Sequence, residues 1–260
     1  CLVGSEMCIR DRSKAGGVRM FLKKLTLLRE EVPSYAKYPF SIPAIQHLKE
    51  LTFQKNVTFF VGENGSGKST LLEAIADKCE FNTAGGGRNN TYEVYGSGSD
   101  LADYIRLSWL PKVTNGFFLR AESFYHFATH IDEVDITGFR SYGGRSLHEQ
   151  SHGESFLSLF KHRFKEKGIY LLDEPEAALS PARQLAFLKI LHDLTKSNQA
   201  QFIIASHSPI LLGYPEADIF SFDGEQIAEV NYEDTDHYTL TKYFLQHREK
   251  LLAELFLDDV

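Results

Sequence analysis

Cysteine is scarce in this chain, which has three in its 260 residues. Two of them, Cys1 and Cys8, lie in an N-terminal stretch that looks foreign to the rest of the chain, so Cys79 is left alone. A single cysteine can form neither a disulfide framework within the chain nor a cysteine metal cluster. The expected location is therefore the reducing cytoplasm.

The chain also lacks long apolar runs and a positive net charge. Hydrophobic residues make up 43% of the composition, yet no apolar stretch approaches the roughly 18 residues that a membrane helix needs. The formal net charge of −7 gives no global reason to expect a nucleic-acid binder. These values indicate a soluble globular protein, and the length allows one large domain or two closely joined lobes.

The first dozen residues, CLVGSEMCIRDR, resemble translated sequencing-adapter read-through. They lack the continuous apolar core of about seven residues that a signal peptide requires. We therefore expect residues 1–19 to be a non-native tail, with Met20 as a candidate native start. Residues 20–260 are expected to form a single domain.

Hydrophobic periodicity predicts strands that alternate with helices. Runs of β-branched and aromatic residues predict strands, and apolar positions at helical spacing predict helices. The predicted strands cover residues 20–28, 48–53, 56–62, 104–111, 116–123, 168–174 and 200–208. The predicted helices cover residues 68–79, 124–134, 154–166, 181–197 and 237–256. This order indicates an α/β fold in which a mainly parallel sheet is flanked by helices.

The sequence GENGSGKST has the G-x-x-x-x-G-K-[ST] pattern of a phosphate-binding loop, placed between a predicted strand and a predicted helix. Its glycines let backbone N–H groups turn toward phosphate oxygens, and the helix N-terminus adds the positive end of its dipole. A glycine-rich turn that binds nothing is the alternative. We expect Lys68 to reach the β- and γ-phosphates of ATP and Ser69 to bind Mg²⁺. The predicted ATP-binding residues are Gly62, Glu63, Asn64, Gly65, Ser66, Gly67, Lys68, Ser69 and Thr70.

Two later strands predict the other catalytic groups. An apolar run leads into Asp173 and Glu174, so that one carboxylate lies by the magnesium and the next can polarise the attacking water. The sequence ASHSP places His207 at the end of another buried strand, where it would face the γ-phosphate. We predict Lys68, Glu174 and His207 as catalytic residues, and Ser69 and Asp173 as metal ligands.

In this order, the phosphate loop, LLDEPEAALSP and ASHSP resemble the motifs of the ATP-binding cassette ATPase superfamily, over about residues 20–222. The resemblance implies a P-loop NTPase fold with an N-terminal antiparallel β region and a small helical lobe at about residues 120–165. It also implies that QSHGE is the signature motif. Ser151 and Gly153 would then bind ATP that is held by the opposite subunit.

The signature segment has a second interpretation. Ser151 and Glu154 have the spacing of a helix capping box, in which each side chain bonds the other residue's backbone N–H. Both interpretations hold if Ser151 turns to phosphate when a partner arrives. Gln150, His152 and Glu154 depart from the family pattern Leu-Ser-Gly-Gly-Gln.

Other family positions are less well matched. The glutamine that the family has after the strand GFFLR is absent, and Glu122 is the nearest candidate for a further metal contact. An ordinary glutamate at a helix N-terminus is the competing interpretation. Residues 178–181 resemble the loop that couples the two subunits, with Ser180 as a helix N-cap. Tyr38 or Phe40 would stack on adenine, but packing explains either aromatic equally well.

The resemblance implies Mg²⁺-dependent ATP hydrolysis, with an ATP-dependent homodimer as the functional state. The segment between Lys68 and Ser151 is too short for the coiled-coil arm of chromosome-organising relatives, and the chain resembles stand-alone ATPases labelled AAA family. Two other classes stay open: the ATP-binding subunit of a membrane transporter, and a non-hydrolysing ATP sensor in a defence or repair complex. A kinase is disfavoured because paired carboxylates followed by His207 suit water activation.

The C-terminal helix predicted at residues 237–256 is amphipathic, and we expect it to dock on its own domain. Its apolar residues include Leu240, Phe244, Leu245, Leu251 and Leu252. Binding of an unidentified partner protein is the alternative.

Overall fold

The computed structural model describes residues 20–82, 86–87, 100–121, 124–134, 144, 146, 148, 152–163 and 167–257. The strands in these residues are β1 (Leu22–Leu27), β2 (Glu50–Thr52), β3 (Val57–Val61), β4 (Ile105–Trp109), β5 (Gly116–Arg120), β6 (Gly168–Asp173), β7 (Ala200–Ala205), β8 (Ala217–Ser221) and β9 (Ala228–Glu229). The α-helices are α1 (Pro43–Gln46), α2 (Lys68–Lys78), α3 (Phe124–Val134), α4 (His152–Arg163), α5 (Pro181–Lys196), α6 (Pro209–Leu212) and α7 (Asp236–Leu255). Short 3-10 helices are η1 (Asp100–Tyr104), η4 (Pro175–Ala178) and η5 (Tyr232–Asp234).

The larger sheet has six strands in the order β5-β6-β7-β3-β8-β9. Pairing is parallel from β5 through β8, and β9 runs antiparallel to β8. A smaller sheet, in the order β2-β1-β4, is antiparallel throughout. These two sheets confirm the α/β P-loop fold and the N-terminal antiparallel β region. Strands β8 and β9 are additions to the sequence prediction.

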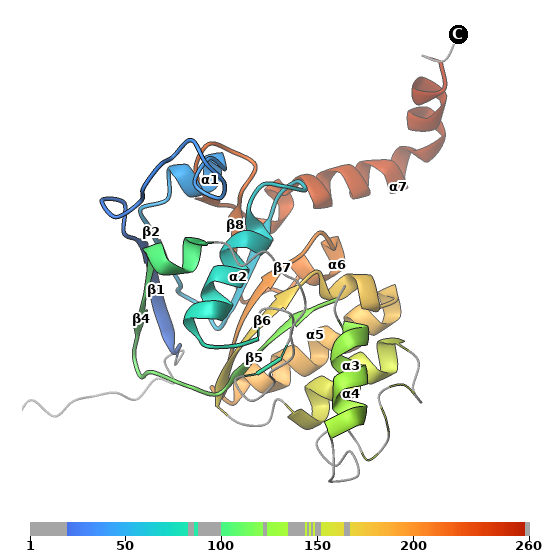
Figure 1. The fold of residues 1–260 in the computed structure, drawn as a ribbon. Helices are drawn as coiled ribbons and strands as arrows, with labels where there is room; N and C mark the ends of the chain where they lie inside the picture. Colours follow the sequence, from blue (N-terminus) through green and yellow to red (C-terminus); the bar gives the residue numbers. More distant parts are fainter. Residues whose placement is uncertain are drawn as a thin grey trace, which may run out of the picture.

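Alternate residues of the parallel strands point to opposite faces of the large sheet, and each face has its own core. Phe60, Leu171 and Ile203 pack with α2 and the antiparallel sheet. The residues beside them in sequence pack with α3, α4 and α5 on the other face. Figure 1 shows this layering, with α2 between the two sheets and α3, α4 and α5 on the opposite side. Both faces are covered, which explains why the parallel strands are continuous apolar runs.

Gln201 of β7 ties the two sheets together. Its Oε1 accepts hydrogen bonds from the backbone N–H groups of Phe21 and Leu22, at 3.0 and 2.8 Å, and its Nε2 donates to the carbonyl of Leu22 at 2.9 Å. Gln201 has no solvent exposure. A polar residue inside a buried parallel strand is thus accounted for by three hydrogen bonds to the start of β1.

The prediction that the C-terminal helix docks on its own domain is wrong. No residue of α7 is buried, and Leu240 and Leu245 are 65% and 74% exposed. Only the start of α7 lies against the body, and the rest runs away from it toward the C-terminus (Figure 1). Across the described residues, no helix combines the length and apolarity required to cross a membrane.

We predict that Gln201→Leu destabilises the protein by about 2–5 kcal/mol, because two backbone N–H groups and a carbonyl would lose their partner in the interior. Gln199→Leu is the matched control, since Gln199 is exposed. Urea unfolding of both variants measures the difference. A loss no larger in Gln201→Leu than in Gln199→Leu would show that these hydrogen bonds contribute nothing.

Candidate functional site

The candidate site lies where three neighbouring parallel strands end. Ala205 of β7 pairs with Asp173 of β6 on one side and with Phe60 of β3 on the other. The phosphate loop follows β3, Glu174 follows β6, and His207 follows β7. The sheet therefore brings together three groups that lie far apart in sequence, at the carboxyl edge where open α/β sheets bind ligands.

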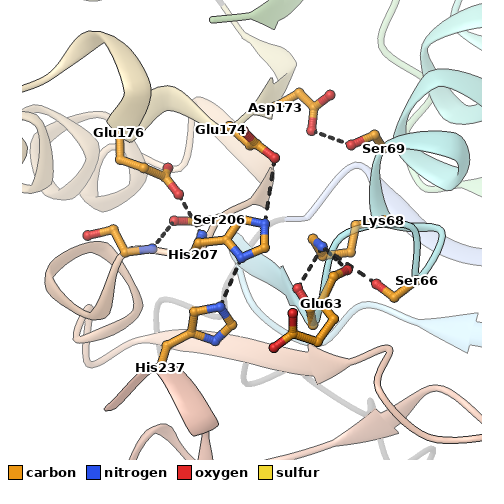
Figure 2. A network of polar contacts seen from close by, with 12 residues as sticks. Glu63, Ser66, Lys68, Ser69, Asp173, Glu174, Glu176, Ser206, His207 and His237 are labelled. Carbon is orange, nitrogen blue, oxygen red and sulfur yellow. Dashed lines mark hydrogen bonds and ion pairs between the residues drawn. The ribbon is translucent and has the colours of Figure 1, made fainter. Parts of the chain in front are cut away.

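Lys68 starts α2 and is 4% exposed. Its Nζ donates to the carbonyls of Gly62 and Glu63 at 2.7 and 2.8 Å, so the side chain curls over the loop that precedes it (Figure 2). Burial lowers the pKa of Lys68, while nearby carboxylates, Glu174 first among them, act in the opposite direction. Gly67 has a φ of 101°, in the left-handed region that favours glycine, and directs the chain into α2.

Ser69 and Asp173 form a pair of oxygen donors suited to Mg²⁺. The Ser69 hydroxyl donates to Asp173 Oδ1 at 2.9 Å, and Asp173 is 5% exposed. Hydroxyl and carboxylate oxygens are ligands that Mg²⁺ prefers, usually together with waters and substrate phosphates. These two residues fit the predicted metal site.

Arg120 is an unpredicted member of the site. It ends β5 and pairs in register with Asp173. Its NH1 lies 2.5 Å from Glu73 Oε1 of α2, and its Nε lies 3.5 Å from Asp173 Oδ2. Arg120 thus connects the helix that follows the phosphate loop with the carboxylate at the end of β6.

Glu174 has a left-handed backbone, with φ 51° and ψ 51°. This conformation is costly for residues other than glycine, and such strain occurs at functional sites. Its backbone N–H donates to the Ala205 carbonyl at 2.9 Å, while its Oε1 lies 3.6 Å from His207 Nε2. The turn after β6 therefore brings the Glu174 carboxylate toward the residue that follows β7.

Two further residues hold His207. Glu176 Oε1 accepts the backbone N–H of His207 at 2.5 Å, and His207 Nδ1 lies 2.9 Å from Nε2 of His237, at the start of α7. Figure 2 shows the His207 ring between Glu174 and His237. Burial lowers the pKa of His207, and the positive charge of Lys68 lowers it further. His207 is therefore neutral near pH 7.

Asp223 binds the backbone at the start of the phosphate loop. Its Oδ1 accepts the backbone N–H of Glu63 at 2.6 Å. A Cβ added at Gly62, where φ is 143°, would lie 2.8 Å from the same oxygen, so this close approach requires glycine. Asp223 comes just after β8, a strand that the sequence prediction missed.

The signature glycine lies against a different part of the molecule. The nearest atoms to a Cβ built at Gly153 belong to Arg183 of α5 and to the Ala178 carbonyl. Glu154 Oε1 lies 3.5 Å from Arg183 NH2. Gly153 therefore packs beside the predicted subunit-coupling loop. Ser151, and with it the predicted capping box, lies outside the described residues.

The other predictions have mixed outcomes. Tyr38 is 62% exposed and its hydroxyl lies 3.2 Å from Thr70 Oγ1, so it stands near the phosphate loop. Phe40 is buried against other aromatic rings, which leaves only Tyr38 of this pair available to a base. Ser180 precedes α5 as predicted but makes no side-chain capping bond. Glu122 lies outside the described residues.

A family model described as an AAA domain matches residues 40–252. The chain belongs to this family. Together with the phosphate loop, the carboxylates after β6 and the histidine after β7, this makes it a P-loop ATPase of the ATP-binding cassette type.

Two curated proteins are similar to this ATPase. The tungstate uptake system ATP-binding protein TupC of Peptoclostridium acidaminophilum is 25% identical over 178 residues, which are 62% of this chain and 79% of TupC. Protein ea59 of Escherichia phage lambda is 47% identical over 47 residues, or 18% of this chain. That match spans 9% of the length of ea59.

Solved structures that are similar to this chain include the SMC head domain from Thermotoga maritima, with 19% identity and a TM-score of 0.46. The match covers 82% of this ATPase and 99% of that domain. The ADP conformation of MJ1267, an ATP-binding cassette of an ABC transporter, has 18% identity and a TM-score of 0.48. That match covers 92% of this ATPase and 99% of MJ1267.

We predict that the free energy of unfolding is about 1 kcal/mol higher for Glu174→Gly than for Glu174→Gln. The reason is that glycine adopts the left-handed backbone without strain, whereas glutamine does not. Both variants lose the carboxylate, so their difference contains the relief of the left-handed backbone, reduced by the larger entropy that glycine loses on folding. Urea unfolding of the two purified variants measures it. Equal stabilities would contradict the assigned strain.

Glu176 gives a prediction about pH. Burial raises the pKa of its carboxyl, and Oε2 is a buried atom without a hydrogen-bond partner among the described residues. A raised folded-state pKa means that stability is lost as pH rises above about 4.3, the value for an exposed glutamate. Glu176→Gln does not titrate, so its stability relative to wild type should increase between pH 5 and pH 8. Chemical denaturation at both pH values tests this, and an unchanged difference would contradict it.

Proposed function

We propose that this ATPase hydrolyses Mg-ATP, that bound ATP closes two copies of the chain into a dimer, and that hydrolysis opens them. The observation that carries the proposal is the separation of two sets of groups. Lys68, Ser69, Asp173, Glu174 and His207 surround the carboxyl edge of the sheet. Gly153 instead packs on the Ala178 carbonyl and Arg183.

In this proposal the nucleotide lies on the phosphate loop. Phosphate oxygens take the place of the Gly62 and Glu63 carbonyls as partners of Lys68 Nζ, which already lies over the loop. Loop N–H groups and the N-terminus of α2 bind the remaining phosphate charge. Ser69 and Asp173 would hold Mg²⁺, which neutralises charge on the β- and γ-phosphates.

Glu174 and His207 then act on the attacking water. Glu174 accepts a hydrogen bond from the water and orients it in line with the γ-phosphate. Its side chain is 40% exposed, which leaves it accessible from the site. His207 Nε2, which has no hydrogen-bond partner among the described residues, is directed to the same place.

The second copy supplies the signature segment. The N-terminus of α4 is held by the packing of Gly153 on Arg183 and on the carbonyl of Ala178, the last residue of η4. This short helix directly follows Glu174. An anion at this helix N-terminus would be stabilised by the helix dipole. The proposal assigns Ser151 and Gly153 to ATP on the opposite subunit, with Tyr38 stacked on the adenine of its own subunit. The cytoplasm is the proposed location.

Similarity to TupC favours a second candidate, in which this ATPase is the ATP-binding subunit of a membrane transporter. That function requires a permease partner, and turnover would rise when the permease is supplied. The soluble dimer requires no permease, so turnover by the isolated chain distinguishes the two. A third candidate, the ATP sensor, predicts tight ATP binding with no phosphate release.

We predict that Glu174→Gln lowers the rate of phosphate release about 100-fold or more, because no carboxylate remains to accept a hydrogen bond from the attacking water. ATP binding should be retained. Unhydrolysed ATP should then hold the variant as a dimer. Light scattering in Mg-ATP measures the mass. A monomer at saturating ATP would exclude the dimer proposal for the chain alone.

In the proposed dimer, each ATP site combines residues of two subunits. This allows a control for the dimer interface in the Glu174→Gln background. Adding Lys68→Ala removes ATP binding. Adding Gly153→Asp introduces a side chain that collides with Arg183 and so displaces the start of α4, where the partner's γ-phosphate would lie. Neither double variant should dimerise alone. Their mixture contains one intact site, made by Lys68 of one subunit and Gly153 of the other, and should form ATP-dependent heterodimers. Dimerisation of the Gly153→Asp double variant by itself would argue against the assigned role in trans.

A further inference from the structure

The histidine after β7 is paired with a second histidine that belongs to none of the motifs. His207 Nδ1 and His237 Nε2 are 2.9 Å apart, and the two ring centroids are 5.1 Å apart. The other nitrogen of His207, Nε2, lies 3.6 Å from Glu174 Oε1 and has no hydrogen-bond partner among the described residues. Each nitrogen of His207 thus faces a different group, as Figure 2 shows.

This geometry determines where the proton of a neutral His207 ring must lie. A hydrogen bond between two imidazoles needs one N–H donor and one bare nitrogen. If His237 Nε2 carries its proton, His207 Nδ1 is bare and the His207 proton lies on Nε2. It then points toward the Glu174 carboxylate, a hydrogen-bond acceptor. The reverse arrangement would leave a bare Nε2 facing a carboxylate, with no proton between them.

We propose that His237 is a positioning residue that keeps the proton of His207 on Nε2, directed at Glu174 and at the position of the γ-phosphate. The inference rests on the proposed function for its effect on turnover. His237 does not touch the reacting atoms. In a histidine ring, the hydrogen bond made by one nitrogen determines whether the other nitrogen carries the proton. His237 acts on His207 in this way, through the bond to Nδ1.

The charges around His207 favour the neutral ring that this role requires. Lys68 brings positive charge toward it, and Glu174 and Glu63 bring negative charge. Burial together with the charge of Lys68 lowers the pKa of His207. A neutral ring has two tautomers, so a group that selects one of them changes what the ring can donate.

The start of α7 is held in place well enough to orient a ring. Tyr232 donates from its hydroxyl to the Pro209 carbonyl at 2.9 Å, two residues beyond His207. Thr235 caps α7 by accepting the Tyr238 N–H and donates to the Tyr232 carbonyl at 2.8 Å. The Tyr232 and Tyr238 rings pack with centroids 4.6 Å apart. His237 is therefore fixed relative to the segment that carries His207.

Four variants of the full chain test the proposal. His237→Phe keeps an aromatic ring and removes the donor, whereas His237→Gln replaces it with an amide N–H that does not titrate. His247→Phe is the matched control, because His247 is exposed on the same helix and its ring packs on Tyr243. His207→Gln identifies the His207 signals by their loss from the spectrum.

The first measurement is a long-range proton–nitrogen NMR spectrum of the ¹⁵N-labelled protein at pH 8, where the two neutral tautomers give different nitrogen shifts. We expect His207 in the Nε2–H form in wild type, His237→Gln and His247→Phe, and a mixture or the Nδ1–H form in His237→Phe. An unchanged His207 tautomer in His237→Phe would overturn the proposal, whether or not the protein hydrolyses ATP.

The second measurement is steady-state turnover. We expect kcat of His237→Phe to fall by about ten- to a hundredfold, the range for removing a group that orients a metal-bound imidazole. KM should change by no more than about twofold, because ATP binding is not altered. His237→Gln should recover most of the lost turnover. A wild-type kcat in His237→Phe would also overturn the role. If wild type shows no turnover but the tautomer shifts, the proposed hydrolysis fails and the positioning role stands.

Discussion

The alignment of three parallel strands is the constraint on which the site depends. Strand β7 lies between β6 and β3, and its last residue, Ala205, pairs with Asp173 on one side and Phe60 on the other. All residues of β3, β6 and β7 are buried, so each strand is fixed in register by packing on both faces. A shift of one residue in any strand would turn its side chains to the opposite face and displace the group that follows it.

The alignment has an electrostatic consequence. It places one buried cation, Lys68, among several carboxylates, of which Glu174, Asp223 and Asp173 act most strongly on it. Arg120 adds a second positive group that contacts both Glu73 and Asp173. Charges removed from water are tolerated when they are paired and hydrogen-bonded, and the contacts of Lys68 and Arg120 meet that condition. The same arrangement leaves oxygen donors at Ser69 and Asp173 that suit a divalent cation.

Sequence patterns predicted the parts of the site that follow local rules. The phosphate loop, the buried strands before Asp173 and His207, and the antiparallel N-terminal region depend on spacing and periodicity, and the structure has them where expected. Arg120, Asp223 and His237 were missed because each acts through a partner distant in sequence and belongs to no motif.

Predictions that depended on what a segment packs against fared less well. The apolar positions of α7 indicated a docked helix, but periodicity shows only that a helix has an apolar face. In the structure that face is uncovered over most of α7. Tyr38 and Phe40 were indistinguishable by sequence, since only the fold determines that Phe40 is enclosed by Tyr35 and Tyr104. Ser180 has the backbone position of an N-cap without the side-chain bond, a distinction that residue type alone does not make.

The strand order also bears on how the chain folds. The phosphate loop is complete in sequence at Thr70, yet its strand, β3, finds its two neighbours only in β7 and β8, far later in the chain. Pairings between such distant segments form slowly, because the entropy of closing the intervening chain is lost before any contact offsets it. A chain still emerging from the ribosome would therefore carry the whole loop motif without the sheet edge that shapes it. ATP that binds only the finished edge stabilises the native state and none of its precursors. Nucleotide binding by this protein thus indicates that the sheet is complete. The presence of the loop sequence alone does not indicate this.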